Sequence, residues 1–264
     1  MKLPKISQSL MKAYVDYLNG KECGLFFQAR YIDKDPHADT EPSDAMRAGV
    51  YFEYLCTGAL PRNGVVPEPD VVYKGKPNEK LSAPYERIIE SAAIFKKIIE
   101  HYDIKIKEVG LVLGDDEING IIDILAEWDG KEVFIDLKYS GLIDDKWSDT
   151  GWDLDALPQK DSLMIQGVHY KILAERCLNI QDIPFYYFVF SSTDPNNVKI
   201  IKQEVDNSKT QSHIVAVHNI LGKIKKEIEF GFTPIPSLIK CSKCPLAFKC
   251  ESKVDYPLID EVYY

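Results

Sequence analysis

The stretch that decides the fold runs from residue 118 to residue 139 and reads INGIIDILAEWDGKEVFIDLKY. It contains two apolar, β-branched runs separated by Asp129-Gly130, a dipeptide that favours a two-residue hairpin turn. We therefore expect two antiparallel strands here. A two-residue turn at that dipeptide would place Asp123 directly opposite Asp136 on the neighbouring strand.

The second strand carries a candidate catalytic pair. Side chains alternate along a strand, so Asp136 and Lys138 lie on one face. Carboxylates held together in a partly buried place repel each other unless a cation lies between them. Mg²⁺ or Mn²⁺ would meet that need, because hard divalent ions prefer carboxylate and water oxygens. Lys138 could then orient or deprotonate a metal-bound water, or stabilise charge that develops on a phosphate. A D-x-K tripeptide is common by chance, so the alternative is an ordinary solvated strand face.

The rest of the chain predicts a sheet covered by helices. Ser9 is a candidate cap for a first helix, and the Pro-, Gly- and Asn-rich stretch 62–80 is expected to be a surface loop. Further helices are expected at residues 43–58, around 88–99, at 160–178 and at 207–230, and further strands at 108–114, 185–192 and 198–205. This order predicts an α/β or α+β fold in which helices flank a central mixed sheet.

Two of these helices carry further polar candidates. Gln166 and Tyr170 stand one turn apart, on one face of the helix at 160–178. Glu53 is a carboxylate among apolar neighbours on the helix at 43–58. The alternative for Glu53 is a residue at the rim of the site without a role in metal binding.

With these motifs in this order, the sequence resembles the RecB-like branch of the PD-(D/E)XK nucleases, which includes phage-type exonucleases and CRISPR-associated iron–sulfur nucleases. In that family a helical Glu or His precedes a strand Asp, a D/E-x-K motif and a helical Q-x-x-x-Y. The matching residues here are Glu53, Asp123, Asp136, Lys138, Gln166 and Tyr170.

The resemblance implies a restriction-endonuclease-like core and a division of roles. Glu53, Asp123 and Asp136 would hold Mg²⁺ or Mn²⁺, Lys138 would assist the attacking water, and the Gln and Tyr of the helical motif would position the site or the DNA backbone. Two departures qualify the match. Tyr139 replaces the threonine of the D-x-K-T-G form. Glu53 stands where many RecB-like members have His, which fits the phage-exonuclease variant and leaves the preferred metal and the number of metals open.

A cysteine motif near the end of the chain predicts a second metal site. Cys241, Cys244 and Cys250 fall within ten residues, and the chain carries no secretion signal that would favour disulfides. Cys23 is our candidate for the fourth ligand, with Cys56 as the fallback. Zinc binds four thiolates as readily as an iron–sulfur cluster does, and spacing alone does not distinguish them.

The family resemblance implies a [4Fe–4S] cluster on Cys23, Cys241, Cys244 and Cys250. A reactive dithiol is a further alternative. We expect the remaining cysteine, Cys177, to be a buried small hydrophobe, and Cys56 as well if it is not a ligand. The whole chain, 1–264, is then expected to form a single nuclease domain. Its N-terminal segment (about 1–30) and C-terminal segment (about 232–264) would be joined by the cluster.

Composition bounds the function. A net charge of −9 argues against a typical nucleic-acid binder, although a divalent-metal centre itself requires acids and local basic patches can persist. No apolar run approaches the roughly 20 residues of a membrane span, so no membrane partner is expected and we interpret the chain as cytoplasmic.

The sequence thus predicts a metal-dependent DNA nuclease, by resemblance an exonuclease of recombination, repair or phage DNA metabolism. A recombination or CRISPR-associated protein partner, the strand polarity, the single- or double-strand preference and the oligomeric state stay open. The first rival is a catalytically inactive nucleic-acid-binding or assembly module that keeps a structural cluster. A second rival is a small zinc-stabilised interaction domain.

Overall fold

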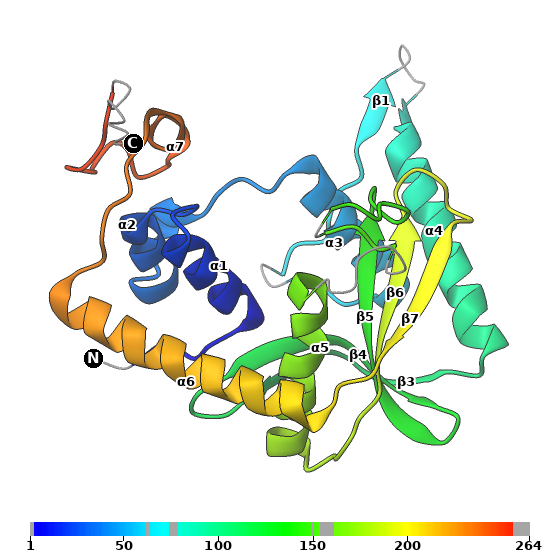
Figure 1. Ribbon diagram of the computed structural model, residues 1–264. Helices are drawn as coiled ribbons and strands as arrows, with labels where there is room; N and C mark the ends of the chain where they lie inside the picture. The colour runs from blue at the N-terminus through cyan, green and yellow to red at the C-terminus, as the bar shows by residue number, and fades with distance from the viewer. Residues whose placement is uncertain (1–2, 62–63, 74–78, 149, 154–160, 256–264) are drawn as a thin grey trace. The chain divides into compact units, whose positions relative to one another are not determined.

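The computed structural model describes residues 3–61, 64–73, 79–148, 150–153 and 161–255 (Figure 1). The chain divides into two compact units, each formed from separate stretches of sequence. We call Pro42–Asp115 with Gly120–Thr210 the sheet unit, and Met1–Glu41 with Asp116–Asn119 and Gln211–Tyr264 the cysteine unit. The single-domain organisation expected from the sequence stays a prediction.

The sheet unit is built on a five-stranded mixed sheet of order β3-β4-β5-β6-β7. Its strands are β3 Lys105–Gly114, β4 Asn119–Trp128, β5 Lys131–Ser140, β6 Phe185–Ser191 and β7 Val198–Gln203. β4 pairs antiparallel with β5, β5 parallel with β6, and β6 antiparallel with β7. The β4–β5 turn is the expected one: Asp129 and Gly130 have φ angles of 50° and 72°, the left-handed conformations that a tight hairpin turn requires.

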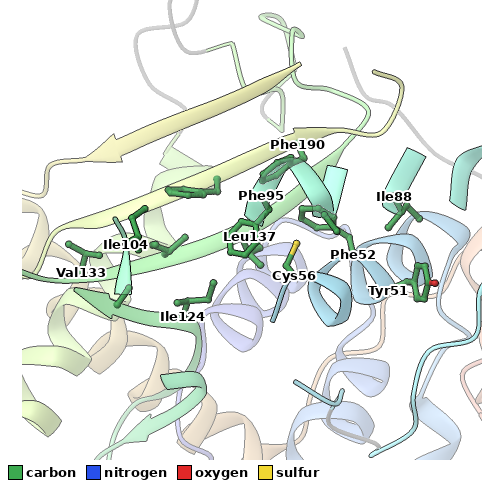
Figure 2. Close-up of a cluster of buried hydrophobic side chains, with 14 of the residues drawn as sticks. Tyr51, Phe52, Cys56, Ile88, Phe95, Ile104, Ile124, Val133, Leu137 and Phe190 are labelled. Carbon is green, nitrogen blue, oxygen red and sulfur yellow. The ribbon is translucent and has the colours of Figure 1, made fainter. Parts of the chain in front are cut away.

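Helices of this unit supply one side of its hydrophobic core. They are α3 Asp44–Thr57 and α4 Ala83–His101. The unit also contains α5 Asp161–Leu173, which continues as a π-helical turn, Ala174–Leu178. Figure 2 shows Phe52 of α3 and Phe95 of α4 gathered with sheet residues such as Leu137 and Phe190. Since side chains alternate, Asp136 cannot share the face that Ile135 and Leu137 turn to this core. The alternation of side chains along β5 therefore directs the Asp136 carboxylate away from the hydrophobic core.

The cysteine unit is helical. It contains α1 Gln8–Leu18, α2 Gly24–Phe27, a π-helical turn Gln28–Ile32, a 3-10 turn Pro36–Ala38, most of α6 Asn207–Phe230, and α7 Leu238–Lys243. Aromatic rings form its core: Phe27 lies 5.3 Å from Tyr14 and 5.6 Å from Phe232, measured between ring centroids. The Tyr14 hydroxyl donates a hydrogen bond to Glu227 Oε2 at 2.9 Å, which joins α1 to α6.

Most of the expected elements are confirmed, including the α/β fold class with helices flanking a mixed sheet. Two local predictions are wrong. Ser7, not Ser9, caps α1, because its hydroxyl accepts the Leu10 N–H at 3.2 Å. The stretch expected to be a loop contains two short antiparallel strands, β1 Val71–Tyr73 and β2 Glu79–Leu81. Each has only three residues, which is too short to show the alternation of a strand. The surrounding proline and glycine residues indicate a loop instead.

Within the part of the chain that the structure describes, no helix is long and apolar enough to cross a bilayer.

Candidate active site

The hairpin turn determines how the two strand carboxylates meet. The β4–β5 ladder pairs Trp128 with Lys131 and continues to Ile124 opposite Ile135, so Asp123 and Asp136 are the next facing positions. Asp123 Oδ2 accepts the backbone N–H of Leu137 at 2.8 Å. The carboxylate of Asp123 is thereby held against the strand that carries Asp136.

Asp136 is buried, with 1% of its surface exposed, and two side chains hold its oxygens. Lys138 Nζ lies 2.5 Å from Asp136 Oδ2, and Gln166 Nε2 donates to Asp136 Oδ1. Lys138 keeps 32% of its side chain exposed, and its ammonium group pairs with a carboxylate that is buried. Gln166 comes from α5, on the crossover between β5 and β6.

Electrostatics make this a costly place for negative charge. Burial, and then the charge of Asp136, raises the pKa of Asp123 well above its ordinary value. Burial also raises the pKa of Asp136, against the opposing effect of Lys138 and Gln166. For Lys138 burial works in the other direction, but Asp136 and Asp123 together outweigh it and raise the pKa of the ammonium group. The three groups thus form one coupled charge cluster.

Glu53 belongs to the same electrostatic neighbourhood. It lies on α3 and is half-buried. Its negative charge contributes to the raised pKa values of both Asp123 and Lys138. The structure therefore brings acids from α3, β4 and β5 together with one lysine.

Tyr170 is placed differently from Gln166, although both lie on α5. Its hydroxyl donates to the backbone carbonyl of Ile121 at 2.7 Å. Its ring packs on Gly120, where an added Cβ would stand only 2.5 Å from the ring. This arrangement fixes α5 against β4, so Tyr170 acts as a positioning residue for the helix that carries Gln166.

Sequence reasoning missed two residues that shape the site. Gly120 gives Tyr170 the room that it needs beside β4, and its place within that strand, three residues before Asp123, was the available signal. Tyr187 falls within the strand expected at 185–192, where the sequence gives it no place among the site candidates. It is fully buried, but it is the register partner of Asp136 on β6, and burial followed by the Asp136 charge raises its pKa. Its hydroxyl donates to Gln203 Oε1 at 3.2 Å.

The donor chemistry of Glu53, Asp123 and Asp136 fits a hard divalent cation. All three offer carboxylate oxygens, and burial raises the pKa values of the Asp123 and Asp136 carboxyl groups, a cost that a bound cation would offset. Among the described residues, no three His, Cys, Asp or Glu side chains already stand in metal-binding geometry. The cation therefore remains a proposal.

The cysteines predicted as ligands lie together in the cysteine unit. Cys23, Cys241, Cys244 and Cys250 line one cavity of about 190 Å³. Burial, followed by the nearness of the other three thiols, raises the pKa of Cys244. Cys23 directly precedes α2, Cys241 lies within α7 and Cys244 directly follows α7, so short helices position three of the four.

The surroundings of this cavity fit a bound thiolate-ligated metal group. The wall is partly apolar, with Phe26 and Ile235, and Lys240, Lys243 and Lys253 supply positive charge that would offset thiolates. The cavity is also more than ten times the roughly 10–15 Å³ that one water requires. Cys56 lies instead in the core of the sheet unit (Figure 2), and Cys177 is half-buried in the π-helical turn after α5. All six cysteines are free thiols.

No family model and no curated protein matches this chain. A solved structure does resemble it: a protein from Eubacterium rectale, provisionally named an exonuclease, is 15% identical, with a TM-score of 0.60. The match covers 97% of this chain and 91% of that one, and it shows a shared fold. The protein SSO0001 matches over 63% of this chain and 69% of its own, at 16% identity and a TM-score of 0.31, which is too low to carry an argument.

Proposed function

We propose that this chain is a divalent-metal-dependent deoxyribonuclease with a PD-(D/E)XK-type centre, acting as an exonuclease. The observation that carries the proposal is the convergence of Asp123, Asp136, Lys138 and Gln166 in one buried charge cluster. A structural core alone does not require two facing carboxylates, whereas a cation site does. The shared fold with a protein named an exonuclease supports the same class and motivates the choice of exonuclease.

The roles follow from the contacts. Glu53, Asp123 and Asp136 would hold Mg²⁺ or Mn²⁺, which when bound supplies a Lewis acid for the phosphate and lowers the pKa of water. The raised pKa of Lys138 favours the ammonium form, so this group is suited to stabilising charge on the phosphate and orienting the attacking water. Gln166 donates to Asp136 and keeps its carboxylate in one orientation. Tyr170 holds α5, and with it Gln166, on the sheet.

Cleavage of end-labelled linear DNA tests this function. The protein is purified anaerobically and assayed with Mg²⁺, with Mn²⁺ and with chelator. We expect metal-dependent shortening, and losses of at least 10²–10³-fold in Asp136→Asn and Lys138→Ala, the scale of removing one charge-stabilising group. Glu132→Gln and Lys131→Ala change charges at the other end of the same strand and serve as matched controls that should retain activity.

The outcomes separate the candidate functions. Full activity in Asp136→Asn would remove the assigned centre. Folded wild-type protein that binds DNA but never cleaves it would be an assembly or binding module. Neither cleavage nor DNA affinity would leave a protein-interaction domain.

We further infer that Cys23, Cys241, Cys244 and Cys250 hold a [4Fe–4S] cluster, with zinc as the alternative. Their common cavity and its lysine-bearing wall support a thiolate-bound group. Iron, sulfide and zinc analysis of the anaerobically purified protein distinguishes the two. Four iron atoms per chain with a visible absorption band would support the cluster, and one zinc per chain with no iron would replace it.

A further inference from the structure

The loop that follows the acid-bearing strand exposes a tryptophan. β5 ends at Ser140, two residues after Lys138, and the loop continues through Trp147 to Trp152. Trp147 has 74% of its surface exposed, whereas Trp152 has 4%. The third tryptophan, Trp128, packs against Tyr186 with 4.7 Å between ring centroids. Trp147 thus differs from both other tryptophans, which are placed inside the fold.

A tight turn holds the backbone at Trp147. Asp145 Oδ1 accepts the N–H groups of both Trp147, at 2.8 Å, and Ser148, at 3.0 Å. The N–H of Trp152 donates to the Leu142 carbonyl at 3.0 Å, which closes the loop at its base. A loop restrained in this way loses little conformational entropy when a ligand binds to it.

Two anchors fix this loop on β7 and the segment before it. Ile143 is buried, with 3% exposure, and its carbonyl accepts Lys199 Nζ at 2.8 Å. Asp144 Oδ2 accepts Asn197 Nδ2 at 2.6 Å, and its other oxygen pairs with Lys199. Asp144 is exposed but paired with Lys199, and Asp145 accepts two backbone N–H groups, so both carboxylates have partners within the unit that reduce their repulsion of an approaching phosphate.

The far end of the loop returns to the acid site. The ring of Trp152 packs against Tyr187, with 5.2 Å between centroids. Tyr187 is the parallel-ladder partner of Asp136. Both ends of the loop are therefore fixed next to the charge cluster: one follows Lys138 along β5, and the other rests on the neighbour of Asp136.

A cation accompanies the exposed ring. Lys146 is exposed, and its Nζ lies 5.0 Å from the centroid of Trp147. A single exposed apolar side chain is ordinary on a protein surface. Trp147 combines exposure with a restrained backbone, an adjacent ammonium group and a loop anchored at a candidate phosphodiester-cleaving centre. An aromatic ring beside a cation is the arrangement that binds single-stranded nucleic acid, because the ring stacks on a base and the cation attracts the phosphate.

We propose that Trp147, with Lys146, stacks an unpaired nucleobase of the DNA strand whose phosphodiester enters the acid site. The inference deepens the proposed function and rests on it. It identifies the substrate class as a single strand or an unpaired strand end, because a base inside a duplex has no free face to offer.

Binding of labelled oligonucleotides without turnover tests the proposal. Affinity is measured with Ca²⁺ in place of the catalytic ion. The ligands are a single strand, the same strand with abasic nucleotides near its end, and a fully paired duplex with blunt ends. Trp147→Ala should weaken single-strand binding roughly 5- to 100-fold, and Trp147→Phe should weaken it less. Phe230→Ala, which removes an aromatic side chain that is 80% exposed on α6, is the matched control and should leave affinity unchanged.

The abasic strand shows whether the base is the recognised group. Wild-type protein should bind the strand with an abasic nucleotide at the stacking position as weakly as Trp147→Ala binds the intact strand, and combining the two changes should add nothing. Unchanged affinity in Trp147→Ala, or an equal loss on intact and abasic strands, would overturn the proposal that Trp147 stacks a nucleobase.

The result is separable from the proposed function. If wild-type protein cleaves DNA and Trp147→Ala leaves single-strand affinity unchanged, base stacking on Trp147 is rejected and the nuclease function stands. If single-strand binding depends on Trp147 but no cleavage occurs, base stacking stands and the nuclease function is rejected. Neither binding nor cleavage would reject both.

Discussion

The two candidate metal sites are built in opposite ways. Two of the three carboxylates of the sheet unit, Asp123 and Asp136, lie on neighbouring strands of a five-stranded sheet whose apolar residues fill a core. The thiols of the cysteine unit are carried by the short helices α2 and α7 and by turns around a cavity. In the first, paired strands and a packed core bring like charges together. In the second, little regular structure holds the ligands.

This difference teaches what a bound metal would contribute to each site. A preformed site spends folding free energy on bringing its ligands together, and the ion recovers part of that cost on binding. A site made of turns gains its structure when the metal binds, so binding free energy becomes folding free energy. Removal of metal should therefore damage the cysteine unit far more than the sheet unit.

The largest effect should come from Cys241→Ser, because Cys241 is the most buried of the four thiols and lies within α7. We expect loss of the bound metal and unfolding of the cysteine unit. Structural metal contributes on the order of 10 kcal/mol, comparable to the whole stability of a domain. Metal content and thermal unfolding by circular dichroism measure this. Cys177→Ser, a change outside the cavity, should keep full metal content. Retained metal and an unchanged melting curve in Cys241→Ser would contradict the proposed ligand set.

A smaller effect on stability is expected from Asp123→Asn, and it is stabilising rather than destabilising. Its raised pKa in the folded protein means that folding favours the protonated acid. The stability that this group contributes is full below its ordinary pKa of about 3.9 and is lost as the pH rises through the raised value. Without divalent ions, Asp123→Asn should therefore exceed wild type in unfolding free energy at pH 7, and the difference should shrink as the pH falls toward about 4.

Urea unfolding in chelator across this pH range measures that difference. The asparagine can still accept the Leu137 N–H, so the comparison isolates the charge. Adding Mn²⁺ should reverse the order, because only wild type gains from binding. A less stable variant at pH 7 in chelator would show that attraction to Lys138 exceeds the cost of burial.

The smallest effects concern the support of the acid site. Gly120→Ala would place a Cβ 2.5 Å from the Tyr170 ring and 3.0 Å from Leu173, so the helix or the ring must shift. We expect a cost of about 1–3 kcal/mol, together with lower cleavage activity, because Gln166 moves with α5. Gly222→Ala on α6 meets no atom within 4 Å and should stabilise by about 0.5–1 kcal/mol. Equal effects of the two substitutions would show that close packing at Gly120 does not matter.

Much of the acid site could be read from residue order. Alternation along β5 and the Asp129-Gly130 turn were enough to predict that Asp123 faces Asp136, because a two-residue hairpin has one register. The expected helix at 43–58 is likewise confirmed as α3, and its ends are local features, a Ser43 cap and a left-handed Gly58. By contrast, β1 and β2 escaped prediction because three-residue strands are stabilised by each other rather than by their own sequence.

The sequence by itself therefore determined the longer helices and strands, the hairpin register and the identity of the candidate ligands, since these depend on local conformational preferences and on periodicity. Only the tertiary structure decided that Gln166 reaches Asp136 while Tyr170 binds the Ile121 backbone, although the two are spaced to share one helix face. It also decided that Cys23 joins the other three thiols, whereas Cys56 lies in an apolar core. These outcomes depend on which distant segments pack together, and packing is governed by the shape of the whole unit rather than by neighbours along the chain.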